Sequence, residues 1–481
     1  MLFNSFSYAL FLPAVFLLYW LPFGKFRLSW QNVLLLVASY VFYCSWDWRF
    51  AFLITFTSAS SFFTALLIEK GQAGSRKFWA ALNIIINLCI LGFFKYAGFF
   101  VDSFKALAGL FGWTITGPAI QIILPVGISF YTFQALSYSI DVYARRIQPT
   151  RDAVAFFSFI SFFPQLVAGP IERATSLLPQ MLAPRRFDYC QAVDGLRQML
   201  WGFFKKLIIA DGCAEVVNQV WGGLDSATGM MLLVCSLLFT FQIYADFSGY
   251  SDIAIGCAKL FGIKLTTNFK VPYFSRNVRE FWRRWHITLM GWFTQYVYFP
   301  LGGSRCSRSR TVLNTIIVFA LSGLWHGADW TFVLWGLYHA LLFVPLILLG
   351  SQRYKDTVAH GRMLPSLGEL VSMVVTFLLI NFGWILFRAP DFTAFSEFVS
   401  RLFSPSLFNY HGLTMKMAAM LAWCAALILV EWIQRERPHV LQIDGYRLFA
   451  SRPARLALYA LVVFLIFYFA GQVQTFIYFQ F

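Results

Sequence analysis

One histidine lies within an apolar stretch that is otherwise nearly uncharged. His326 belongs to residues 322–330 (SGLWHGADW), inside a run from about 311 to 350. A polar group inside an apolar membrane segment is costly, so its presence suggests a function. Gly323 and Gly327 flank it and would let a ligand or another backbone approach closely. Two interpretations stay open from these residues alone: His326 is a catalytic base, or it is a hydrogen-bonded core residue.

A second histidine follows a run of cations. His286 ends the segment 280–286 (EFWRRWH). Its basic neighbours are expected to lower its pKa and keep the imidazole neutral, ready to accept or donate a hydrogen bond. A structural role is an equal alternative. Three further histidines lie in polar loops and are expected to be solvated: His360, His411 and His439.

The region 264–310 is strongly basic, with nine Lys and Arg residues, one acid (Glu280) and many interleaved aromatics. A helix here would be amphipathic and would lie at the membrane interface. That role alone explains the charges. The alternative adds binding of a multiply phosphorylated ligand such as coenzyme A, because guanidinium groups match phosphates bidentately. The residues predicted to bind this ligand are Lys270, Arg279, Arg283 and Arg284.

Two aspartates, Asp246 and Asp252, follow an apolar run. They are candidates for a proton or ion site, although buried pairing with Arg or with the backbone is the favoured interpretation.

The chain that must position these groups is a membrane protein. Of its 481 residues, 59% are apolar and 12% charged, against about 25% charged in soluble domains. We expect an all-α, polytopic protein with one domain over residues 1–481 and ~11–13 helices, some of them re-entrant. The predicted spans are 7–22, 30–45, 48–68, 78–101, 119–140, 153–169, 194–221, 228–245, 312–327, 329–350, 368–388, 415–433 and 455–473.

The charge and motifs exclude several classes of function. A net charge of +16 between apolar runs suits cytoplasmic loops near anionic lipid, and no soluble basic face is available for nucleic acid. The eight cysteines form no Cys-x-x-Cys pair, so no metal site is predicted. Motifs for nucleotide hydrolysis, zinc proteolysis and serine hydrolysis are absent.

Several sequence blocks in order resemble the membrane-bound O-acyltransferase (MBOAT) family, most closely its members that acetylate exported polysaccharides such as alginate. They are residues 124–134 (LPVGISFYTFQ), 163–173 (FPQLVAGPIER), 246–252 (DFSGYSD), 268–273 (NFKVPY), 281–286 (FWRRWH) and 322–327 (SGLWHG). The resemblance implies tilted helices around a cytosol-facing funnel. It implies that His326 is the catalytic histidine and that His286 occupies the family's second polar position.

The chain ends with residues 476–481 (FIYFQF). From the residues alone this is an aromatic anchor at the membrane interface. It also resembles a C-terminal tail of export-type family members, in which the tyrosine is thought to carry the acyl group. The resemblance therefore implies a catalytic role for Tyr478.

The implied reaction takes acetyl from cytosolic acetyl-CoA, with no bound cofactor. His326 would act as general base, while His286 would orient the thioester or stabilise the oxyanion. A Gly-Asp-Ser esterase block is missing, so a separate periplasmic SGNH-type acetyltransferase and other export proteins are the expected partners. The protein would lie in the bacterial inner membrane, in contact with lipid. The alternatives are a D-alanyl transfer protein for teichoic acid and a non-catalytic transporter or flippase.

The distribution of positive charge predicts the topology. Lys25 and Arg27 follow the first span, and Arg447, Arg452 and Arg455 precede the last one. Because basic loops stay inside, both termini should lie outside. Reporter fusions at either end should be active in the periplasm; cytosolic activity at either terminus would contradict this assignment.

Overall fold

The computed structural model describes residues 1–21, 27–114, 122–350, 354, 356–472 and 474–477. Within these residues it contains helices and turns, with no β-strand. The chain divides into two compact units: residues 1–193 with 257–266, and residues 194–256 with 267–481. The all-α, polytopic class predicted from the sequence is confirmed. The single domain and the funnel stay predictions.

The first unit is built mainly from α-helices. They are α1 (Phe6–Tyr19), α2 (Arg27–Cys44), α3 (Phe50–Lys70), α4 (Ala73–Leu91), α5 (Ala97–Leu110), α6 (Ile128–Tyr143), α7 (Ala153–Ser161), α8 (Phe163–Leu166) and α9 (Ala174–Leu182). Its interior combines aromatic rings with bonded polar groups. Glu172, for example, is buried and accepts hydrogen bonds from the backbone and the hydroxyl of Thr266.

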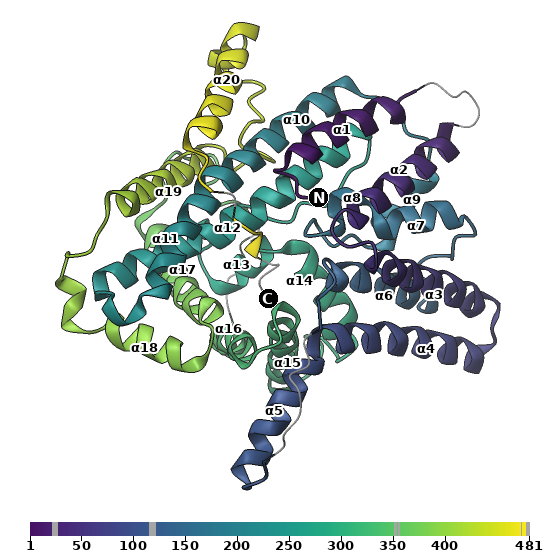
Figure 1. Cartoon of the computed structure of the whole chain (residues 1–481), viewed down its shortest axis with the longest axis horizontal. Helices are drawn as coiled ribbons and strands as arrows, with labels where there is room; N and C mark the ends of the chain where they lie inside the picture. The colour runs from purple at the N-terminus through teal and green to yellow at the C-terminus, as the bar shows by residue number, and fades with distance from the viewer. Residues whose placement is uncertain (22–26, 115–121, 351–353, 355, 473, 478–481) are drawn as a thin grey trace. The chain divides into compact units, whose positions relative to one another are not determined.

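The second unit carries every described candidate for chemistry. Its helices are α10 (Tyr189–Phe204, which begins in the first unit), α11 (Asp211–Gly222), α12 (Gly229–Leu260, which ends in the first unit), α13 (Val278–Arg284), α14 (Ile287–Phe293), α15 (Arg308–His326), α16 (Trp330–Leu348), α17 (Leu367–Arg388), α18 (Phe392–Leu402), α19 (Met415–Ile433) and α20 (Arg452–Phe469) (Figure 1). A π-helical segment, Lys205–Ala210, joins α10 to α11 without a break.

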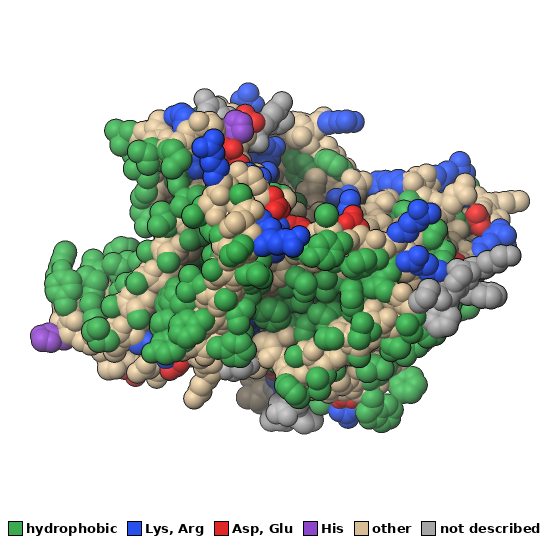
Figure 2. Space-filling model, turned by 90° about the horizontal axis from the view of Figure 1, so that it is seen from above, with side chains coloured by type: hydrophobic (Ala, Val, Ile, Leu, Met, Phe, Trp, Pro, Cys, Tyr) green, Lys and Arg blue, Asp and Glu red, His purple; other side chains and the backbone are tan. Residues whose placement is uncertain are grey.

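Seven described segments are long and apolar enough to cross a membrane: Phe50–Lys70, Ala73–Leu110, Gly229–Leu260, Trp330–Leu348, Leu367–Arg388, Met415–Ile433 and Arg452–Phe469. Large apolar side chains on them are exposed, and hydrophobic groups occupy much of the face in Figure 2. Six predicted spans are not among these seven: 7–22, 30–45, 119–140, 153–169, 194–221 and 312–327. The segment 194–221 forms helices, but it contains Lys205, Lys206 and Asp211.

Helix α12 is longer than the sequence suggested. The predicted span ended at residue 245, before Asp246, yet the helix continues to Leu260. The carboxylates do not end it because lysines neutralise them: Lys206 lies 2.8 Å from Asp246 and Lys205 lies 2.6 Å from Asp252. A charge that is paired inside the fold can be accommodated in a buried helix.

Glycines let α10 and α12 approach closely enough for these ion pairs. A Cβ atom at Gly202 would lie 2.6 Å from the carbonyl oxygen of Gly249, and one at Gly249 would lie 2.8 Å from the carbonyl oxygen of Gly202. Gly256 meets the Gly195 carbonyl in the same way. Side chains at these positions would push the two backbones apart.

We predict that Gly202→Ala destabilises the protein, because its methyl group would collide with the backbone of Gly249 and Ile253 as well as with the Ile253 side chain. Overpacking of this kind costs about 1–3 kcal/mol. Gly222→Ala is the matched control, since no atom lies within 4 Å of a Cβ atom there. Thermal unfolding in detergent should show a lower midpoint for Gly202→Ala alone. Equal midpoints would contradict the close crossing.

Candidate active site

His326 is placed by a tight helical hairpin. It is the last residue of α15, and after three residues α16 begins at Trp330, capped by the Asp329 side chain on the backbone N–H of Thr331 at 2.8 Å. The two helices touch through glycines: a Cβ atom at Gly323 would collide with the carbonyl of Phe332, and one at Gly336 with the carbonyl of Phe319. The backbone around His326 is therefore held rigidly.

Aromatic rings enclose the His326 imidazole, which is 3% exposed. The ring centroids of Trp325, Trp335 and Phe387 lie 5.0, 5.1 and 5.5 Å away, all edge-on. Such walls exclude bulk water and strengthen electrostatic interactions inside. The His326 ring is therefore buried among aromatic side chains, while its catalytic role stays a prediction.

His286 lies at the junction of α13 and α14 in an unusual conformation. Its φ is 45° and its ψ 51°, the left-handed region that branched and bulky residues rarely adopt. Two backbone hydrogen bonds hold the junction against the preceding loop: Lys270 N–H to the Arg284 carbonyl, and Ile287 N–H to the Asn268 carbonyl, both at 2.9 Å. Strain of this kind is concentrated at functional sites.

Asn268 determines which nitrogen of His286 carries the proton. The Asn268 Oδ1 atom accepts from the Thr288 hydroxyl at 2.9 Å and lies 3.1 Å from His286 Nδ1. Its Nδ2 atom donates to Ser251 Oγ. Because Oδ1 can only accept, Nδ1 must be the protonated nitrogen, which leaves a lone pair on Nε2. Among the described residues, buried Nε2 has no hydrogen-bond partner.

Burial lowers the pKa of His286 to about 3, so the ring is neutral at physiological pH. The predicted direction is correct, but the cause differs from the one expected. Desolvation lowers the pKa, whereas neighbouring Arg284 is engaged elsewhere: its guanidinium bonds Glu280 at 2.8 Å. Neutral His286 can accept a proton or a hydrogen bond at Nε2. It is less suited to the oxyanion role, which requires a donor there.

The structure brings the two histidines together, with ring centroids 6.5 Å apart and Trp325 beside both. His286 comes from a strained helix junction and His326 from a helix end 40 residues later. Imidazole is the side chain that most often serves as a general acid or base, so this pair is the candidate for proton transfer.

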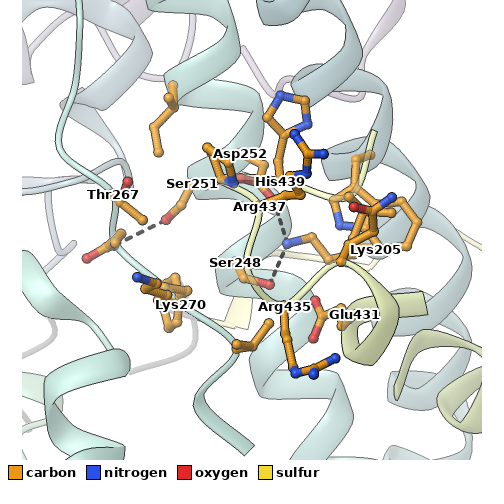
Figure 3. A pocket seen from close by; sticks show the side chains of 18 of the residues that line it. Lys205, Ser248, Ser251, Asp252, Thr267, Lys270, Glu431, Arg435, Arg437 and His439 are labelled. Carbon is orange, nitrogen blue, oxygen red and sulfur yellow. Dashed lines mark hydrogen bonds and ion pairs between the residues drawn. The ribbon is translucent and has the colours of Figure 1, made fainter. Parts of the chain in front are cut away.

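Asn268, the partner of His286, also lines a polar pocket of about 540 Å³, including its open mouth. Figure 3 shows the charged side chains of this pocket. Lys205, Lys270, Arg435 and Arg437 make its lining basic, and Asp252 and Glu431 bring two acids into it. Trp201, Tyr244 and Phe269 supply apolar walls. The pocket thus combines cations, which suit phosphate groups, with rings, which suit an apolar arm.

The four predicted ligand-binding cations have different environments. Lys270 is exposed and lines the pocket, and Arg283 is exposed on α13. Arg279 donates to the Leu346 carbonyl at 3.1 Å. Arg284 is buried and shares Glu280 with Arg276, which also bonds that carboxylate at 2.9 Å. Arg284 and Arg279 therefore fix the loop, while Lys270 and Arg283 are accessible.

Sequence reasoning missed part of the pocket. His439 was expected to be solvated, and that expectation is wrong: it is 6% exposed and bonds Asp194 at 2.8 Å. His360 and His411 are exposed, as expected. The run Arg435, Arg437, His439 at the end of α19 was the available signal, since clustered cations beside an apolar helix often bind anions.

Asp246, Asp252 and Tyr478 are the remaining predicted groups, and His339 is a further buried histidine. Asp246 and Asp252 are paired, as favoured, but with lysines rather than arginines. His339 is fully buried on α16, and the ring centroid of Trp335 lies 4.9 Å away. Tyr478 lies outside the described residues.

Fold and site together define a multi-pass membrane protein with paired buried histidines beside a basic pocket. The profile of the membrane-bound O-acyltransferase family matches residues 143–381. The chain is 37% identical to the probable alginate O-acetylase AlgI of Azotobacter vinelandii, over 92% of this chain and 84% of that one. It is 32% identical to the peptidoglycan O-acetyltransferase of Helicobacter pylori, over 100% and 98%. A teichoic acid D-alanyltransferase of Bacillus subtilis is 27% identical, over 57% and 71%.

The chain belongs to the membrane-bound O-acyltransferase family and is an O-acyltransferase.

We predict that Asn268→Asp makes the transfer rate fall at low pH within the range 5–8. A carboxylate beside Nδ1 favours the imidazolium and raises the pKa of His286 from about 3 towards neutrality. Protonation would then remove the Nε2 lone pair as the pH falls. The measurement is the pH dependence of the acyl-transfer rate, with wild type as reference. Identical profiles would show that the His286 lone pair takes no part.

Proposed function

We propose that the protein takes acetyl from cytosolic acetyl-CoA and passes it across the inner membrane for O-acetylation of an exported, alginate-like polysaccharide. Support comes from two acetyl-transferring relatives that align over 84% and 98% of their own lengths. The name of the first refers to alginate and that of the second to peptidoglycan, so a polysaccharide acceptor is common to both.

The observation that carries the proposal is the meeting of pocket and histidines at Asn268. This residue lines the basic pocket and also bonds His286, whose ring faces that of His326 across 6.5 Å. A ligand whose charged end rests in the pocket can therefore extend its other end towards two neutral or basic imidazoles. Acetyl-CoA has this form, with phosphates at one end and a thioester at the other.

The donor would be held by the exposed cations. Lys270 and Arg437 line the pocket and Arg283 lies on neighbouring α13. Their charges suit the phosphate groups of coenzyme A. Arg279 and Arg284 support the same loop through Leu346 and Glu280. Of the four predicted cations, Lys270 and Arg283 would contact the ligand, while Arg279 and Arg284 would hold the loop that carries those two residues.

In the chemical step, His326 would remove the proton of an acceptor hydroxyl as its oxygen attacks the thioester carbonyl carbon. The new C–O bond forms, the C–S bond breaks, and the departing thiolate takes the proton back from the imidazolium. His286 would accept a hydrogen bond at Nε2 and so orient the hydroxyl or the thiol. Acyl transfer of this kind needs no oxidant and no further energy source.

Tyr478 would be the acceptor hydroxyl, acting as an acyl carrier for a periplasmic SGNH-type acetyltransferase and other export proteins. A phenol of pKa about 10 is almost fully protonated at neutral pH, so a base at this point increases its reactivity. The resulting aryl acetate would be a reactive donor for the sugar. This arrangement requires both termini outside, as the positive charges of the loops predict.

D-alanyl transfer is the second candidate, favoured by the 27% identity to a teichoic acid D-alanyltransferase, although that alignment covers only 57% of this chain. A carrier-protein thioester would then replace acetyl-CoA. Retention of radiolabelled acetyl-CoA by the purified protein would exclude it. A non-catalytic transporter or flippase is disfavoured, because the chain belongs to a family of O-acyltransferases.

His326→Ala should reduce acetylation by about 10²–10⁴-fold, the usual cost of losing a general base. His360→Ala is the matched control, because His360 is exposed and pairs only with Glu436 among the described residues, at 3.0 Å. Acetyl content of the secreted polysaccharide is measured at equal protein abundance in the membrane. Near-normal acetylation in His326→Ala would show that His326 is a packing residue and not the general base.

A further inference from the structure

The acyl-transfer step makes no use of one buried charge cluster of the second unit. Lys206, in the π-helical segment, lies 2.7 Å from Asp211 and 2.8 Å from Asp246 on α12. All three residues are less than 9% exposed. One ammonium faces two carboxylates, so the cluster carries a net negative charge and can accept further hydrogen bonds.

Those additional contacts come from the C-terminal tail, residues 474–477. The backbone N–H of Ile477 donates to Asp246 Oδ2 at 2.7 Å, and Lys206 Nζ donates to the Gln474 carbonyl at 3.2 Å. The tail thus gives the cluster one donor and one acceptor. In Figure 1 the yellow end of the chain returns from α20 to α12, which carries Asp246.

The tail side chains are buried together with its backbone. Phe476 is 3% exposed and Ile477 2%. The centroid of the Phe476 ring lies 5.0 Å from that of Tyr250 and 5.9 Å from that of Phe247. Phe247 in turn stands edge-on to His286 at 4.6 Å. One aromatic ring therefore separates the tail from the candidate active site.

We propose that Lys206, Asp211 and Asp246 form a docking site for the C-terminal tail of the same chain. Lys206 and Asp246 are positioning residues: they hold the tail backbone at residues 474 and 477, and so fix where the last four residues begin. A charged acceptor buried in a protein binds a backbone N–H more strongly than water-exposed groups do. The consequence for acetyl transfer rests on the proposed function, in which Tyr478 follows the docked segment.

The docking is tested by the reactivity of a cysteine introduced at Ile477, which retains the backbone N–H. The full-length protein is used in membranes, with the cysteines that are not buried (Cys44, Cys89, Cys190 and Cys306) replaced by serine. N-ethylmaleimide should modify Ile477→Cys slowly and Thr475→Cys quickly, because Thr475 is exposed. Asp246→Asn or Lys206→Met should accelerate labelling at 477 by at least about tenfold, since a charge-assisted contact is lost.

Lys205→Met is the matched control. It removes the adjacent buried lysine, whose ammonium bonds Ser248 at 2.9 Å and Asp252 at 2.6 Å, and it should leave labelling at 477 slow. If the cluster variants fail to fold, the tail is changed instead. With the probe at Phe476→Cys, Ile477→Pro removes the N–H donor while Ile477→Ala keeps it, and only the proline variant should label quickly.

Acetylation is measured in parallel, with Tyr478→Phe as reference. Unchanged labelling in the cluster variants, or in Ile477→Pro, overturns the docking site whatever the activity. Faster labelling with acetylation lost, as in Tyr478→Phe, supports both docking and the carrier role. Faster labelling with full acetylation supports docking and shows that the tail takes no part in transfer.

Discussion

The close crossing of α10 and α12 through facing glycines is the constraint on which the second unit depends. It brings Lys205 and Lys206 within 2.6–2.8 Å of carboxylates that the interior of an apolar helix would otherwise not tolerate. Neutralised in this way, α12 continues through the core to Leu260. Asp252 then lines the basic pocket, and Asp246 bonds the C-terminal tail. The contact between α10 and α12 therefore positions a carboxylate in the pocket and another beside the tail.

The two histidines are held in place by different physical means. His326 is held by helix packing: glycines at the α15–α16 hairpin fix the backbone and tryptophan rings fix the imidazole. His286 is held by hydrogen bonds, since Asn268 fixes the tautomer and the backbone is strained at φ 45°. Burial keeps the second ring neutral. The centroids of the two rings lie 6.5 Å apart, and Trp325 lies beside both.

The sequence predicted the class of fold, because apolar runs are long and local. It also singled out His326, because a histidine within an apolar run is costly, but it left a catalytic role and a core role open. It failed where the result depends on distant partners. Asn268 stood in a family-like block, but its contacts with Ile287 and Thr288 depend on the fold and gave no sequence signal. His439 lies in a polar loop of the sequence, yet it is buried because Asp194 lies opposite. Arg284 looked available for a ligand, but Glu280 on the same helix already binds it.

The π-helical segment Lys205–Ala210 has a consequence for how the chain tolerates changes in length. Each residue of an α-helix turns the chain by about 100°, and a π segment accommodates an extra residue within a continuous helix. Here that residue lets adjacent lysines face Asp252 and Asp246, six positions apart on α12. Deleting one residue would rotate one lysine away from its carboxylate. Insertions and deletions should therefore accumulate in the loops, while the segment between α10 and α11 keeps a fixed length.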